Sequence, residues 1–111
     1  GSYKVRAGRI ATRIAEMERE DIGEKIDLQI SQCQFKLKEA NRRLVMAMKN
    51  VENADENLRC ATVGFKEGVL QTTDVMAAQT AWMQAQSQKI DAEVDVRLSQ
   101  VNLRKALGVL Q

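Results

Sequence analysis

The sequence contains no histidine and no proline, and only six of its 111 residues are glycine. The absence of histidine removes the commonest metal ligand and general base, which weighs against a catalytic or transition-metal site. Aromatic residues make up only 4% of the chain, whereas alanine, leucine, lysine, glutamate, glutamine and arginine dominate. This composition is typical of long helices and coiled coils.

Three kinds of segment are also lacking. There is no apolar run long enough to span a membrane, and no signal peptide is recognisable. No dense block of lysine and arginine occurs and the net charge is only +2, so the charged residues indicate solvated helix faces and no nucleic-acid partner. The chain has the size of one modest domain and begins as though it were cut from something longer.

Cys33 and Cys60 are the two cysteines. On a single helix they would lie about 40 Å apart at a rise of 1.5 Å per residue, so they cannot form a disulfide with each other. They therefore say nothing about the redox compartment. We expect Cys33 to be a small core residue, because a buried thiol packs as a small apolar group.

A heptad pattern dominates the first half of the chain from Ile26 onward. Its apolar positions recur in alternating steps of four and three, and large residues alternate with alanine, which lets a partner helix approach closely. The pattern extends over more than five heptads and predicts one long helix, from about residue 3 to residue 67. The seam consists of Ile26, Ile30, Cys33, Leu37, Ala40, Leu44, Ala47, Val51, Ala54, Leu58, Ala61 and Phe65.

Before Ile26 the apolar residues move to a shifted stripe, which indicates a helix that faces a different neighbour. These residues are Val5, Ile10, Ile14, Met17 and Ile22. The same stretch carries many carboxylates, but helical spacing distributes them around the axis and basic residues lie beside them. A hard cation needs oxygen ligands that converge, so we interpret this cluster as a solvated face and predict no metal site. Its acidic members are Glu16, Glu18, Glu20, Asp21 and Glu24.

A second heptad pattern predicts another helix over about residues 73–108, with Gly108 as a stop signal. Lys89 is the one charged residue in its seam, and its aliphatic stem can pack while the amine reaches water. The seam consists of Val75, Ala78, Trp82, Ala85, Lys89, Ala92, Val96, Ser99, Leu103, Ala106 and Leu110. An adjoining seam of Met76, Thr80, Met83, Ser87, Ile90, Val94 and Val101 makes the apolar surface too wide for a lone hairpin, which indicates a second neighbour.

Turn chemistry interrupts the two helical patterns only between Phe65 and Val75. Gly68 suits the position just past a helix C-terminus, and Thr72 or Thr73 can cap the next helix through a side-chain oxygen. So short a connection, about residues 68–72, forces the second helix to fold back antiparallel on the first. The sequence therefore predicts a single domain over residues 1–111, an all-α antiparallel two-helix coiled-coil hairpin with a long first helix and a shorter second one.

The segment around this turn resembles a known family. The run Gly64–Thr80 is similar to the periplasmic tip of TolC-like outer-membrane efflux proteins, with an aromatic residue, a glycine three residues later, Asp-Val, and then Ala-Gln-Thr. The ending Leu103–Gly108 is similar to the end of the corresponding family helix. In that family three chains form an outer-membrane β-barrel that continues as an α-helical barrel in the periplasm. The resemblance implies that this chain is one helical hairpin of that barrel, more like the hairpin of the second half.

The resemblance also assigns roles at the tip. It implies that Glu67, Gly68 and Val69, with Leu70 beside them, meet the hairpin of a periplasmic adaptor protein, and that Asp74 faces the pore entrance. Some members carry a second acidic residue one turn later, where this chain has Ala77. Some carry a basic residue in the tip loop, where Leu70 or Gln71 stands here. A charge-latched entrance would therefore lack its partner groups in this chain.

The expected function is a structural segment of the periplasmic duct of an efflux channel in the cell outer membrane, through which small molecules are exported. The implied partners are two further copies in a homotrimer and the adaptor of an inner-membrane pump, with no cofactor and no enzymatic activity. The exposed seams predict that this chain on its own self-associates. The alternative is a stand-alone coiled-coil interaction module such as an adaptor hairpin, although the pattern from Gly68 to Asp74 and Val75 argues against it.

Overall fold

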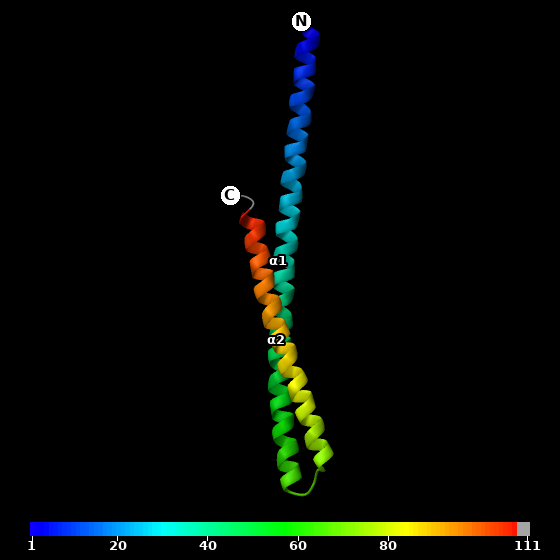
Figure 1. Cartoon of the computed structure of the whole chain (residues 1–111), viewed down its shortest axis with the longest axis vertical. Helices are drawn as coiled ribbons and strands as arrows, with labels where there is room; N and C mark the ends of the chain where they lie inside the picture. The colour runs from blue at the N-terminus through cyan, green and yellow to red at the C-terminus, as the bar shows by residue number, and fades with distance from the viewer. Residues whose placement is uncertain (109–111) are drawn as a thin grey trace.

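The computed structural model describes residues 1–108, which form two helices, α1 (Ser2–Lys66) and α2 (Thr72–Gly108). The helices run side by side in opposite directions and meet at one tight connection (Figure 1). The molecule is 100 Å long and its radius of gyration is 27.2 Å, about twice the 13 Å of a globular chain of this length. These features confirm the predicted antiparallel hairpin with a long first helix, and no strand occurs in residues 1–108.

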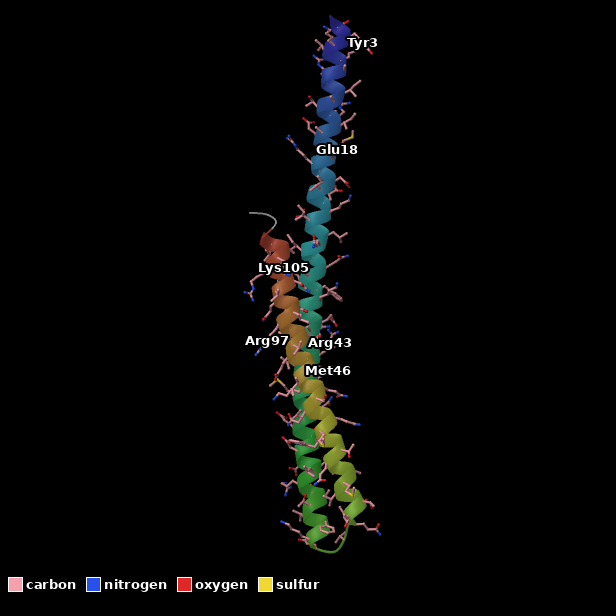
Figure 2. The ribbon with its side chains drawn as sticks, viewed as in Figure 1. Tyr3, Glu18, Arg43, Met46, Arg97 and Lys105 are labelled. Atoms are coloured by element: carbon pink, nitrogen blue, oxygen red, sulfur yellow. The ribbon has the colours of Figure 1, made fainter. Side chains whose placement is uncertain are left out.

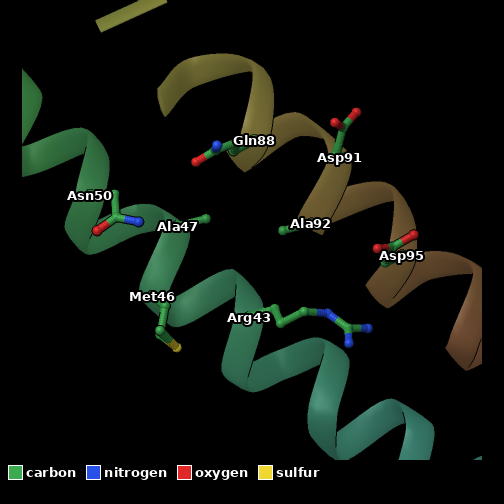
Figure 3. Close-up of a pocket in the computed structure, with 8 residues that line it drawn as sticks. All are labelled: Arg43, Met46, Ala47, Asn50, Gln88, Asp91, Ala92 and Asp95. Carbon is green, nitrogen blue, oxygen red and sulfur yellow. The ribbon is translucent and has the colours of Figure 1, made fainter. Parts of the chain in front are cut away.

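The contact between the helices follows the two predicted seams. Every buried residue in the described part of the chain is an alanine or a valine, so the two backbones approach closely along an alanine-rich stripe. In Figure 3 the side chains of Ala47 and Ala92 point toward each other across this contact. The buried residues are Ala40, Ala47, Val51, Ala61, Ala78, Ala85, Ala92, Val96 and Ala106.

A shallow groove accompanies the contact at the layer of Ala47 and Ala92. It is rimmed by polar groups of both helices, Arg43 and Asn50 from α1 and Asp91 and Asp95 from α2 (Figure 3). The groove exists because alanine side chains are too short to fill the space beside the contact. It contains no converging set of ligands that could perform chemistry.

The seams depart from the prediction at one described position. Phe65, at the end of the first seam, was expected to be buried but is 46% exposed. Lys89 is half-buried as expected, and its Nζ lies 4.0 Å from Oε1 of Glu93 one turn later. The Leu110 position lies outside the described residues.

The second apolar seam of α2 lies on the side of the helix away from α1. Val94 is two residues from the buried Ala92 and two from the buried Val96, and two residues rotate a helix by about 200°. The sequence predicted that the two seams adjoin, but the structure places them on opposite sides of α2, and Met76 and Met83 are exposed. Because only α1 lies against α2, the outer seam has no neighbour within residues 1–108.

The first part of α1 projects beyond the end of α2 and has no neighbour in the described part of the chain (Figure 1). Cys33 of α1 and Lys105 of α2 line one hollow, so they lie at the same level of the hairpin. Gly108, the last residue of α2, therefore lies opposite about residue 30 of α1. We call residues 2–29 the overhang. All five apolar residues of its shifted stripe are exposed, as expected for a helix that faces a neighbour absent here: Val5, Ile10, Ile14, Met17 and Ile22.

Candidate functional site: the hairpin tip

The end of α1 is closed by a network of backbone hydrogen bonds. The Gly68 amide donates to the Phe65 carbonyl at 3.1 Å, and the Val69 amide donates to the Gly64 carbonyl at 2.8 Å. This pair of bonds is the Schellman arrangement, which requires a left-handed residue directly after the helix cap. Gly68 supplies it with φ of 76°, the only positive φ among residues 1–108. The backbone geometry of Gly68 therefore agrees with the prediction that this glycine lies just past the C-terminus of the first helix.

Gly64 is a second requirement of the turn. Its carbonyl also accepts a hydrogen bond from the Leu70 amide, at 3.1 Å, so two amides converge on one oxygen. A Cβ atom placed on Gly64 would lie 2.7 Å from Cδ1 and 2.8 Å from Cγ of Leu70. The absence of a side chain at position 64 thus allows Leu70 to fold back over the last turn of α1.

The start of α2 is capped by Asp74. Its Oδ2 accepts a hydrogen bond from the backbone amide of Gln71 at 2.8 Å, which satisfies an amide that precedes the helix. The negative charge also lies in the first turn, where it meets the positive end of the helix dipole. The predicted cap by Thr72 or Thr73 is wrong, because neither hydroxyl bonds to the backbone of the turn; the carboxylate reaches back and takes that role.

The structure brings all the sequence-predicted site residues into the same short segment. Glu67 is the C-cap residue of α1, Gly68 and Val69 make the turn, and Asp74 lies in the first turn of α2. Val69 projects with 76% of its surface exposed, whereas Leu70 is 37% exposed because it packs on Gly64. The tip therefore presents Val69 as a largely exposed apolar side chain, in a segment that also contains the carboxylates of Glu67 and Asp74.

Sequence reasoning did not single out Gly64. The available signal was a glycine inside the last turn of a strongly helical pattern, where alanine would favour the helix by about 1 kcal/mol. The reason for a glycine at position 64 is the position of Leu70, six residues later. Only the folded turn reveals that contact.

A polar contact joins the two helices above the tip. Nε1 of Trp82 in α2 donates a hydrogen bond to Oδ1 of Asp55 in α1. Trp82 is half-buried in the seam, so its ring packs while its N–H finds an acceptor, as is usual for tryptophan. Together with the pairing of Ala47 and Ala92, this bond sets the register of the hairpin.

The remaining charged groups belong to the helix surfaces. Glu56 accepts two hydrogen bonds from Arg59, at 2.6 and 3.0 Å, and this contact lowers the pKa of its carboxyl and raises that of the guanidinium. Cys60 lies beside this pair, with its Sγ 3.5 Å from Oε1 of Glu56. Cys33 is half-buried in the seam, and both cysteines are free thiols. No group of three or more potential metal ligands converges within residues 1–108.

Comparison with known proteins gives one result. The sequence model of the family described as "Outer membrane efflux protein" matches residues 5–109, which is nearly the whole chain. No curated protein and no solved structure is matched. Neither described helix has a stretch that is both sufficiently apolar and long enough to cross a lipid bilayer. The family match, together with the hairpin and its tip, identifies the chain as a member of the outer membrane efflux protein family, whose members are components of outer-membrane efflux channels.

Proposed function

We propose that this hairpin is a wall segment of the periplasmic duct of the efflux channel and that its tip forms the entrance to the duct. The family match over residues 5–109 carries the proposal. The two-sided apolar character of α2 supports it, because a helix with α1 on one side and an exposed seam on the other suits a row of side-by-side helices. In the full-length protein three copies would close this row into a ring. The hairpin would conduct small molecules without acting on them chemically.

The tip is proposed to contact the periplasmic adaptor of an inner-membrane pump. Val69 offers an exposed apolar side chain, and the Schellman turn holds it in a fixed position between Glu67 and Leu70. Exposed apolar residues at a rigid hairpin end are suited to insertion against a partner helix pair. Gly68 serves this contact indirectly, since its left-handed backbone sets the direction in which Val69 points.

Asp74 is proposed to line the entrance, with one copy from each of three chains. Carboxylates brought together by three-fold symmetry repel one another and attract cations. In the full-length protein reconstituted in a planar bilayer, we expect Asp74→Asn to weaken block by multivalent cations and to reduce cation selectivity. Asparagine keeps an oxygen that can accept the bond from Gln71, so the turn should persist.

Two control variants sharpen this measurement. Asp91→Asn removes the same charge about 26 Å further along α2 and should change cation block much less. Asp74→Ala removes both charge and cap and should also cost about 1 kcal/mol of stability, which circular dichroism can measure. Unchanged block and selectivity in Asp74→Asn across salt concentrations and pH would remove this residue from the entrance.

The alternative proposal is a stand-alone coiled-coil module such as an adaptor hairpin. The sequence of the complete gene distinguishes it from the duct segment through the segments that flank this hairpin. Amphipathic β-strands of an outer-membrane barrel on either side of this hairpin would support the duct. Lipoyl-like β segments in their place would support the adaptor hairpin.

A further inference from the structure

The overhang separates its charges along its length. Residues 2–13 contain four basic residues and no acidic one, while residues 14–27 contain six carboxylates and two basic residues, a net charge of −4. Within the described residues, only Lys25 and Asp21 of this stretch form an ion pair, at 3.0 Å. The basic half is made of Lys4, Arg6, Arg9 and Arg13. These four cations therefore have no counterion among residues 1–108.

The overhang also carries a regular apolar stripe. Tyr3, Ala7, Ile10, Ile14 and Met17 recur in steps of four and three, which places them on one helix face. Ile10, Ile14 and Met17 line one shallow groove on this face together with the basic side chains beside them. The three are between 51% and 60% exposed. In Figure 2 the labelled Tyr3 and Glu18 extend from a length of α1 that has no other ribbon beside it.

These two patterns complement each other when a second copy is turned end to end. In an antiparallel alignment about a centre near residue 12, Ile10 of one copy meets Ile14 of the other, and Ala7 meets Met17. The same alignment places the basic half of each overhang beside the acidic half of its partner. In a parallel alignment each half would face its own charge, and like charges across a helix pair are unfavourable.

We propose that the overhang is a self-complementary surface that binds the overhang of a second copy of this chain in antiparallel orientation. The alignment pairs residues 2–22 of each copy over about 30 Å, which is long enough for a two-stranded coiled coil of three heptads. Flanking pairs would form twice by symmetry, between Lys4 and Glu18 and between Arg6 and Glu20. The proposal is independent of the duct function, because it concerns only the assembly of the 111-residue chain.

Light scattering of the 111-residue chain at micromolar concentration tests the assembly. The expected mass is twice 12.5 kDa. Ile14→Glu places a charge in the central layer and should give a monomer that is still helical by circular dichroism. The matched control Ile90→Glu makes the same change on the exposed outer seam of α2 and should leave the dimer intact. A monomeric wild-type chain, or dissociation by Ile90→Glu and not by Ile14→Glu, would overturn the proposal.

Charge exchange tests the complementarity. A Lys4→Glu, Arg6→Glu variant and a Glu18→Lys, Glu20→Lys variant should each fail to self-associate, and their mixture should form a heterodimer. Raising the salt concentration should weaken the wild-type dimer. Retained self-association by both charge variants would contradict a pairing based on these residues.

Spin labels test the relative orientation of the two overhangs in the dimer. The label is attached to Ser2→Cys, and Cys33→Ala and Cys60→Ser remove the two free thiols that would also react. In the antiparallel dimer the two labels lie about 30 Å apart, since each is ten residues from the centre at 1.5 Å per residue. Labels within about 15 Å, as adjacent strands of a parallel pair require, would refute the antiparallel arrangement.

Discussion

At the scale of single residues, the tip depends on two glycines that serve different purposes. Gly68 is required for its backbone angle, since φ is 76° and a Cβ atom there would meet nothing within 4 Å. Gly64 is required for space, since a Cβ atom there would overlap with Leu70. The first requirement can be predicted from sequence, because a glycine after a helical pattern is a familiar helix stop. The second cannot, because it depends on where Leu70 lies.

Gly64→Ala should destabilise the hairpin by about 1 kcal/mol. Alanine gains about 1 kcal/mol in helix propensity, but displacing the Leu70 side chain costs about 1–3 kcal/mol, as overpacking usually does. Thermal unfolding followed by circular dichroism measures the difference.

Gly23→Ala is the matched control, because it is the same substitution inside α1 at a position with no neighbour within 4 Å. It should leave the unfolding temperature unchanged or raise it. If Gly64→Ala were as stable as Gly23→Ala, the close packing of Leu70 would not limit the turn.

At the scale of helices and seams, the chain agrees with its heptad patterns almost residue by residue. Steps of four and three fix which face of each helix is buried, so the alanine layers were predictable. The cross-helix bond between Trp82 and Asp55 was not, because Asp55 lies outside the seam and gives no apolar signal. The cap by Asp74 was also not predicted. A carboxylate at the third position of a helix can accept a hydrogen bond from the turn as well as a threonine at the start can, so the sequence does not decide between them.

Lys89→Leu tests the seam of α2. Leucine would extend apolar contact in a half-buried position, whereas the ion pair with Glu93 is long at 4.0 Å and worth about 0–1 kcal/mol. We expect the unfolding temperature to stay the same or to rise. Glu93→Gln, which removes only the ion pair, serves as the control. A clear loss of stability in Lys89→Leu with none in Glu93→Gln would mean that the ammonium is held by something other than Glu93.

Trp82→Phe tests the contact that sets the register. Phenylalanine keeps an aromatic ring in the seam but has no N–H to donate, which leaves Asp55 without its partner. We expect a loss of about 1–2 kcal/mol in chemical denaturation, since a hydrogen bond to a charged group contributes about 1.5–3 kcal/mol. Asp55→Asn keeps an acceptor oxygen and should cost less. Equal stability of Trp82→Phe and the wild-type chain would remove this bond from the account.

At the scale of the whole molecule, the hairpin leaves apolar surface exposed on the far side of α2 and along the overhang. The sequence predicted this excess from seams too wide for two helices, but which copy or partner covers each surface is decided by contacts outside the chain. The site residues were predicted through resemblance to a family, because a contact residue at a tip has no chemical signature comparable with a catalytic group. The hairpin explains why those residues lie together, because its one turn joins the end of α1 to the start of α2.

The most direct test of the entrance role is site-specific photocross-linking in the full-length protein, in cells that contain its adaptor. A photoreactive residue replaces either Val69 at the tip or Val45 on α1, which is also a largely exposed valine but lies about 30 Å from the end of its helix. The account predicts a cross-link to the adaptor from position 69 and none from position 45. A cross-link from position 45 together with none from position 69 would contradict the proposal that the tip is the adaptor-facing entrance.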